Sequence, residues 1–345
     1  MRKPFGRPLL GAVVVGAGIG LFAAPAGHAA QPLAGPSGFR VVDLGTLHPG
    51  GDSSAAAING HGDIAGASDG HAVLWRRGHM IDLGVPKGAA SSAATALNDR
   101  GDVVGYLRIQ VSGGEDPVFT LHAFLWRGGR MHDLGTLPGG DYSVATAVNS
   151  AGDIVGRAGA SAGVYNTHAV MWHQRRIVDL QPGGLISQAE DITADGWIVG
   201  MRGTPAEPGN DNQVVAWFRG GSTPSLFRGV AFAANDRHQI AGSDDAIGAA
   251  VVWSRGVTTR LALPAGDVSG QAEDINDRGV VVGWADSGPV VWHDAVPTVL
   301  PGLVPPESGG AAAGGINDRG AIVGSASTAD FHGHAVMWTR LARRA

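Results

Sequence analysis

The chain has 345 residues, of which 56 are glycine, 16% are charged and none is cysteine. The lack of cysteine excludes disulfide scaffolds, thiolate zinc sites and cysteine nucleophiles, and a hydrophobic content of 44% excludes a long disordered chain. The formal net charge is −5 for the whole chain and −8 (22 basic minus 30 acidic residues) without the first 30 residues, which argues against nucleic acid and anionic lipid as main partners, because both reward clustered lysine and arginine.

The first 30 residues have the pattern of a secretory signal peptide. Basic residues at positions 2, 3 and 7 precede an apolar run over 9–24, and small residues follow. That run is shorter than the ~20 residues that span a membrane, so we expect cleavage after Ala29 or Ala30 and no stable membrane insertion afterwards. The mature chain would hold 22 basic and 30 acidic residues, and we expect it to be secreted and extracellular.

Residues 31–345 are predicted to form one domain of seven repeats. A twelve-residue cassette begins with Ala, ends with Gly and carries Asn at its fifth position in six copies and Thr193 in the other. The cassettes end at Gly66, Gly105, Gly156, Gly200, Gly242, Gly283 and Gly324. A tryptophan follows each of them: Trp75, Trp126, Trp172, Trp217, Trp253, Trp292 and Trp338.

Each repeat is predicted to contain four short strands. In the second repeat these end near 97 and cover 102–105, 122–126 and 131–134, with an Asn-Asp-Arg-Gly turn after the first. The alanines suit an innermost strand crowded around an axis, and the tryptophans would fill the space between neighbouring sheets. Four strands per ~40–45 residues is the size of a β-propeller blade.

The chain ends predict how such a ring would close. The seventh repeat stops at 338–341, too early for a good fourth strand, while 39–44 matches the fourth-strand pattern of 131–134 and 177–180. We therefore predict an all-β fold, a seven-bladed β-propeller closed by an N-terminal strand in the last blade. Other blade counts are the alternative.

The repeat resembles that of the HAF-repeat family of extracellular bacterial proteins. The matching features are His-Ala-Phe-Leu-Trp at 122–126, Asp-Leu-Gly-Thr-Leu at 43–47 and 133–137 with the Gly-Gly-Asp that follows, and the Asn-x-x-Gly-x-x-x-Gly cassette. The similarity covers nearly all of 40–338 and weakens in repeats four to six, where the histidine position holds Gln213, Ala249 and Gly288. The resemblance implies export and a repeat fold, and it implies no particular activity.

The loops between the second and third strands are the candidate binding surface. They vary in length, the long ones being 107–121, 157–167 and 201–213, whereas the other turns are short. Variable loops on a rigid scaffold often carry binding, although idle surface loops are the alternative. The candidate ligand-binding residues in these loops are Glu115, Asp116, Tyr165, Asn210 and Asp211.

Four carboxylates interrupt the small residues of the innermost strands. Glu190, Asp191, Glu273 and Asp274 could face a central channel in repeats four and six. There they could act as an acid/base pair, hold a cation, or simply line a hydrated channel.

No motif indicates a metal, a cofactor or a serine nucleophile. The histidines four residues before the repeat tryptophans lie in different repeats, so we expect a structural role for them and no metal site. Two Gly-x-Ser-x-Gly matches lack the helix that a hydrolase elbow needs. We therefore expect no cofactor and no catalytic residues.

The main functional hypothesis is a secreted, non-enzymatic binding module. Its ligand would be an extracellular glycan, cell-wall polymer or protein, held by the variable-loop face. One alternative is a carbohydrate-active hydrolase or lyase that uses the inner carboxylates, and another is a purely structural surface protein.

Overall fold

The structure is a computed structural model that describes residues 38–112, 118–161, 167–174, 176–182, 186–203, 212–218, 221–245 and 248–341. Regular structure within these ranges is β, apart from one 3-10 turn at Pro306–Ser308. None of the described segments forms a helix with the length and apolarity needed to cross a lipid bilayer. The predicted all-β class is confirmed.

The strands form antiparallel groups of four, which we number sheets 1 to 7 in chain order. Sheets 1 to 3 contain β2 (Ser53–Ile58), β3 (Ile64–Ser68), β4 (His71–Arg76) and β5 (His79–Gly84); β6 (Ala89–Leu97), β7 (Val103–Gln110), β8 (Phe119–Arg127) and β9 (Arg130–Asp133); and β10 (Ser143–Val148), β11 (Ile154–Gly159), β12 (Thr167–His173) and β13 (Arg176–Asp179). Sheets 4 and 5 contain β14 (Ile186–Ile192), β15 (Ile198–Gly203), β16 (Gln213–Phe218) and β17 (Gly221–Ser222); and β18 (Phe227–Ala234), β19 (Gln239–Asp244), β20 (Ala249–Ser254) and β21 (Val257–Arg260). Sheet 6 contains β22 (Gly270–Ile275), β23 (Val281–Ala285), β24 (Gly288–His293) and β25 (Val296–Val299), and sheet 7 contains β26 (Ala311–Ile316), β27 (Ile322–Ser327), β28 (Gly333–Arg340) and β1 (Phe39–Asp43).

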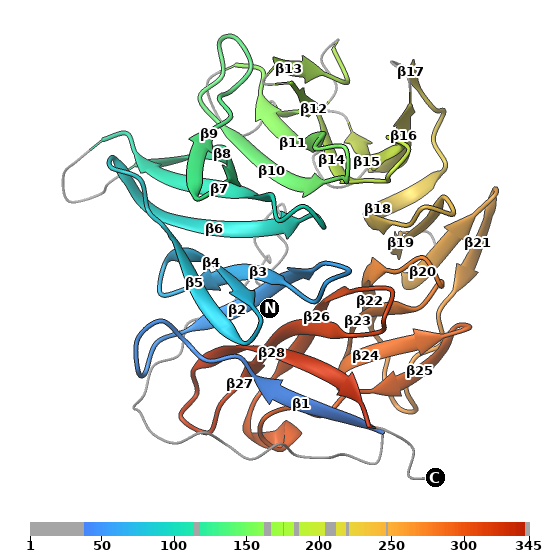
Figure 1. The fold of residues 1–345 in the computed structure, drawn as a ribbon. Helices are drawn as coiled ribbons and strands as arrows, with labels where there is room; N and C mark the ends of the chain where they lie inside the picture. The colour runs from blue at the N-terminus through green and yellow to red at the C-terminus, as the bar shows by residue number, and fades with distance from the viewer. Residues whose placement is uncertain are drawn as a thin grey trace, which may run out of the picture.

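The sheets have a propeller-like arrangement. Their first strands lie toward the middle, and fourth strands such as β13, β21 and β25 lie at the periphery (Figure 1). Consecutive first strands contact one another, and β26 of sheet 7 contacts β2 of sheet 1. A short pairing of β16 with β18 also links sheets 4 and 5 into one eight-stranded sheet. The hydrophobic clusters lie mainly between neighbouring sheets.

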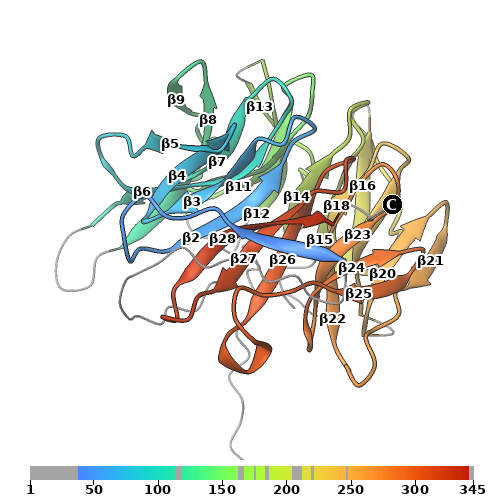
Figure 2. The same cartoon turned by 60° about the horizontal axis from the view of Figure 1, so that its bottom comes forward.

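The N-terminal strand lies in the same sheet as the C-terminal strand. β1 runs antiparallel to β28, from Phe39 opposite Arg340 to Asp43 opposite Val336 (Figure 2). Val41 is 1% exposed and packs in one cluster with Trp338 and Ile322. The fourth strand of sheet 7 therefore comes from the other end of the chain.

Every first strand carries a bulge that the sequence reading missed. The pairing register between first and second strands shifts at the second cassette position in all seven sheets. This shift brings the cassette's last glycine against the backbone of the first strand: a Cβ on Gly324 would lie 2.0 Å from the carbonyl oxygen of Ala312. The recurring glycine therefore reflects a lack of space, because no side chain fits there.

The cassette asparagines link neighbouring sheets. Asn59 Nδ2 donates to the carbonyl oxygen of Asn98 at 3.1 Å, and Asn317 Nδ2 donates to that of Asn59 at 2.9 Å. The same bond is formed by Asn98, Asn149, Asn235 and Asn276, each to the next turn. Thr193 has no amide to make this bond; at that junction the Ala194 N–H donates to Asp236, a bond that Gly60, Asp236 and Asp277 also make to the aspartate of the next turn.

The repeat tryptophans pack between sheets to different degrees. Trp292 and Trp338 are fully buried, and their indole N–H groups donate to the carbonyl oxygens of Ala262 and Pro301 in the preceding repeat. Trp126 and Trp253 remain partly exposed. Both still pack against hydrophobic clusters between neighbouring sheets, as predicted, but they are less completely buried than the other repeat tryptophans.

We expect Trp126→Ala to lower the free energy of unfolding by about 2–3 kcal/mol, because this side chain packs against a hydrophobic cluster but keeps part of its surface in water. Trp292→Ala is the matched reference, for which a loss of about 3–5 kcal/mol is expected. Urea denaturation of both variants gives the two values. Equal losses would contradict the packing described here.

Candidate functional site

The five loop residues proposed from the sequence cannot be placed. Glu115, Asp116, Tyr165, Asn210 and Asp211 all lie outside the described residues. Their role in ligand binding stays a prediction. The site that can be built from coordinates is the group of inner carboxylates.

The four inner carboxylates come together around the middle of the molecule. Glu190 and Asp191 lie on β14, Glu273 and Asp274 lie on β22, and β18 runs between these two strands. They occupy the second and third cassette positions, at the bulge. Each pair is close enough to the other for its charge to raise carboxyl pKa values across the gap.

The two aspartates connect neighbouring first strands through hydrogen bonds to the backbone. Asp191 accepts the N–H groups of Ile192 at 2.7 Å and of Ala234, on the next first strand, at 2.8 Å. Asp274 accepts the N–H groups of Ile275 and Ile316 in the same manner. Both side chains therefore have a structural task, comparable to that of Thr95, whose hydroxyl donates to the carbonyl oxygen of Ala145.

The two glutamates differ in their hydrogen bonding. Glu273 accepts from Gln271 Nε2 at 2.7 Å and from Trp284 Nε1 at 3.1 Å. Glu190 forms no hydrogen bond within the described residues, and it is partly exposed. Its charge is balanced in part by the nearby Arg157.

Loss of hydration shifts these carboxyls toward their protonated forms. It raises the pKa of Glu190 to about 7, with Asp191 and Glu273 adding to the increase and Arg157 opposing it. It also raises the pKa of Asp191 to about 6 and that of Asp274 to about 7, although backbone N–H bonds favour the ionised form of both. The group can therefore hold and release protons near neutral pH.

Arg157 is the residue of this site that the sequence reading missed. It is 4% exposed, and its guanidinium donates to the Tyr142 hydroxyl and to Gln188 Oε1, each at 3.1 Å. The sequence did contain a signal for it. Arg157 directly follows the last glycine of its cassette, and the other six repeats have an uncharged residue at this position. A charge on that interior strand indicates an acidic neighbour across the molecule.

The repeated histidines have structural partners. His71, His122, His168 and His334 each pair through Nδ1 with a fourth-strand aspartate of the same sheet, at 2.7–3.0 Å. The aspartates are Asp82, Asp133, Asp179 and Asp43. In the part of the chain that the structure describes, no group of three such side chains is arranged to hold a metal ion.

The raised pKa values of the inner carboxyl groups predict that the stability of the protein depends on pH. Their pKa values rise from 3.8–4.5 to about 6–7 on folding, so the folded state binds more protons than the unfolded state between these limits. The free energy of unfolding should therefore fall as pH rises from about 4 to about 7. Glu190→Gln should weaken this dependence and stabilise the protein above pH 7, as measured by urea midpoints at pH 5 and pH 8.

The control is Asp294→Asn, at an exposed position. Hydrogen bonds donated to the carboxylates of Asp133 and Asp43 raise the pKa values of His122 and His334, and loss of the histidine protons also destabilises the protein as pH rises above 6.5. Both variants retain that contribution, so their difference isolates Glu190. An unchanged pH dependence in Glu190→Gln would show that its carboxyl keeps its ordinary pKa.

No family model matches the chain, and no curated protein is significantly similar to it in sequence. Among solved structures, the chain is similar to TolB from Acinetobacter baumannii, with 10% sequence identity and a TM-score of 0.41. The match covers 84% of this chain and 64% of the TolB chain, so this chain spans less than two thirds of that protein.

Proposed function

We propose that the protein is a secreted, non-enzymatic binding module built as a closed seven-bladed β-propeller. Its ligand is an extracellular glycan, cell-wall polymer or protein, bound by the loops between second and third strands. The observation that carries the non-enzymatic assignment is the commitment of three inner carboxylates, Asp191, Glu273 and Asp274, to hydrogen bonds within the scaffold. A scaffold of this kind presents loops without moving.

Two sets of contacts support closure with seven blades. The asparagine bonds run from turn to turn and include the step from Asn317 to Asn59. A hydrophobic cluster also joins Val323 and Ala335 of sheet 7 to Ile64 and Trp75 of sheet 1. Sheets 7 and 1 thus contact each other through both polar and apolar side chains.

A panel of glycans, wall polymers and extracellular proteins tests the binding function. We expect the purified protein to bind at least one of them saturably, and the double variant Tyr165→Ala/Asn210→Ala to bind it about tenfold more weakly. Arg130→Ala is the control, because this exposed residue follows a turn at the opposite strand ends. Binding that is equally weakened by both changes would argue against the loop face.

One observation favours the enzymatic alternative. Glu190 is reached by solvent, has no hydrogen bond within the described residues and has a pKa of about 7, which suits a general acid. Hydrolysis or elimination of a polysaccharide that is lost in Glu190→Gln but retained in Asp294→Asn would support this alternative over the binding module.

A further inference from the structure

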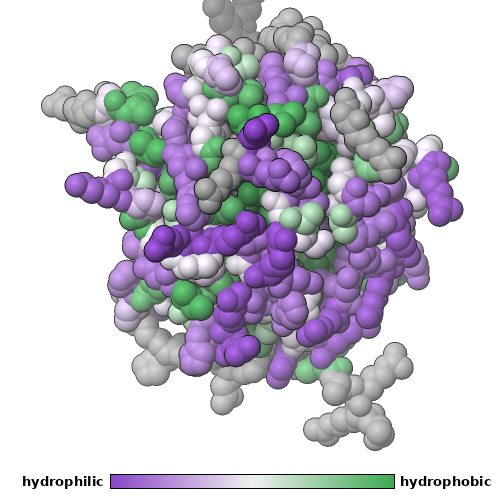
Figure 3. Space-filling view, turned by 45° about the horizontal axis from the view of Figure 1, so that its top comes forward, coloured by the Kyte–Doolittle hydropathy of each residue, from purple (hydrophilic) through white to green (hydrophobic). Residues whose placement is uncertain are grey.

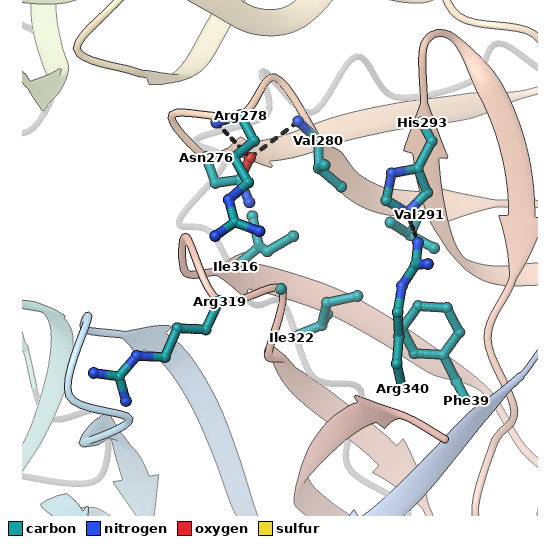
Figure 4. Close-up of a pocket in the computed structure, with 11 residues that line it drawn as sticks. Phe39, Asn276, Arg278, Val280, Val291, His293, Ile316, Arg319, Ile322 and Arg340 are labelled. Atoms are coloured by element: carbon teal, nitrogen blue, oxygen red, sulfur yellow. Dashed lines mark hydrogen bonds between the residues drawn. The ribbon is translucent and has the colours of Figure 1, made fainter. Parts of the chain in front are cut away.

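A cavity of about 340 Å³ opens where sheets 6 and 7 meet (Figure 4). Its apolar wall is formed by Phe39, Val280, Val291, Ile316 and Ile322. Polar side chains stand around this wall: Asn276, Arg278, His293, Arg319 and Arg340. The volume lies at the lower end of the range for small-molecule pockets.

The arginines of this cavity have no carboxylate partner. Arg278, Arg319 and Arg340 form no ion pair with any described residue. The carboxylates in the same turns are used elsewhere, since Asp318 accepts the N–H of Asp277 and Asp277 accepts that of Asp236. The cavity therefore holds three guanidinium groups, none of which forms an ion pair with a described carboxylate.

In the second repeat, the arginine at this cassette position has a carboxylate partner within its own turn. Arg100 is the counterpart of Arg278 and Arg319, and it pairs with Asp102 two residues later at 3.1 Å. Asp102 also binds Arg127, at 2.6 Å. In repeats six and seven the position of Asp102 is taken by Val280 and Ala321. These repeats keep the arginine and lack its acid.

An equivalent cavity of about 450 Å³ lies between sheets 2 and 3. There Gln174 stands at the position of Arg340, and Arg127 at that of His293. A Cβ on Gly152 would meet the guanidinium groups of Arg100 and Arg127, whereas a Cβ on the equivalent Gly320 would meet nothing within 4 Å. The space beside the turn glycine is thus occupied by carboxylate-paired arginines between sheets 2 and 3, whereas it is open beside Gly320.

Arg340 is held in position without being neutralised. Its guanidinium stacks over the Phe39 ring, 5.3 Å from the ring centre, and its Nη2 donates to His293 Nε2 (Figure 4). Burial and the charge of Arg340 lower the pKa of His293, so the ring is neutral and its proton lies on Nδ1. A fixed guanidinium loses little freedom when it binds a ligand.

We propose that this cavity binds an oxyanion, a carboxylate or a phosphate, carried on a sugar-sized body that rests against the apolar wall. Arg278 and Arg340 bind the anionic group, and Arg319, which extends toward sheet 1 in Figure 4, adds to the attracting field. The face drawn in the space-filling view is covered mainly by hydrophilic residues, with hydrophobic residues gathered toward its middle (Figure 3). The first-to-second-strand turns that form this cavity lie at the opposite strand ends from the loops of the proposed function, so the inference does not depend on that function.

Three sugars with one ring body test the proposal. Isothermal titration calorimetry of the purified protein with glucuronate, glucose 6-phosphate and uncharged glucose should give saturable binding of at least one charged sugar, with a Kd of about 1 mM or lower, and none of glucose. Binding of glucuronate alone points to a sugar acid as the ligand, and binding of glucose 6-phosphate alone to a phosphate ester. Either result supports an oxyanion site.

Arginine variants then locate the site. Arg278→Gln and Arg340→Gln should each weaken binding about tenfold, while Arg260→Gln, which removes the same charge from an exposed edge strand, should not change it. All three positions are exposed, so the fold should be unaffected. Absence of charged-sugar binding, equal binding of glucose, or equal losses in all three variants would overturn the proposal.

Discussion

Replacing Gly324 with alanine should cost about 4 kcal/mol of folding free energy or more, a large fraction of the total stability of a typical domain. The added Cβ would lie 2.0 Å from the carbonyl oxygen of Ala312 and 3.0 Å from the Cα of Ala313. Both are backbone atoms of the paired first strand, so no side chain can move aside to make room. Relief would require β26 and β27 to separate at the bulge.

Gly314→Ala in the same sheet is the matched control. Gly314 is exposed at the bulge itself, and a Cβ there would approach its nearest neighbours only to 3.9 Å. We expect a change within about 0.5 kcal/mol, as for ordinary surface substitutions. Circular dichroism and urea denaturation of the two variants provide the comparison. A stable Gly324→Ala would mean that this pairing is looser than described.

Val41→Asp should destabilise the protein by about 3–5 kcal/mol, because it places an unpaired carboxylate in the cluster around Trp338. Val41 lies opposite Trp338 in the pairing of β1 with β28. Loss of β1 from sheet 7 would also expose the edge of β28 to solvent and to other chains. Limited proteolysis near the N-terminus should therefore become faster, alongside a lower urea midpoint.

The neighbouring Arg40 supplies the control for this strand. It is exposed, and its Nε donates to Thr339 Oγ1 at 3.0 Å. Arg40→Ser should cost about 1 kcal/mol or less, since a solvated hydrogen bond contributes little. If Val41→Asp were equally mild, β1 would be dispensable, and the proposed closure of the ring through the N-terminal strand would be untenable.

Repetition made the strands predictable. Each cassette places an Asn-initiated turn between two apolar segments, and short-range turn chemistry determines where such strands begin and end. The bulge was not predicted from the sequence. In repeats one, two, four and six, cassette positions two and three are both less buried than positions one and four, and this pattern is visible only in the structure. Two adjacent positions of this kind break the alternation of a regular strand, because a bulge inserts one extra residue.

The candidate sites also show which features the sequence predicts and which only the structure reveals. The sequence drew attention to Glu190, Asp191, Glu273 and Asp274, since charges are out of place among alanines. It could not show that Asp191 and Asp274 bind the backbone of the next first strand, a contact made 42 or 43 residues away along the chain. The free arginines at 278 and 319 looked like ordinary turn residues, because their significance lies in which acid is missing and which sheet lies opposite.

By itself, the order of residues determined the β class, the four-stranded unit and its turns, because those depend on neighbours a few positions apart. The tertiary structure decided which tryptophans are buried, why the last cassette position must be glycine, and where charge is left without a partner. Those features depend on distances between segments that are remote in the chain, and only the packing of one sheet against the next establishes such distances.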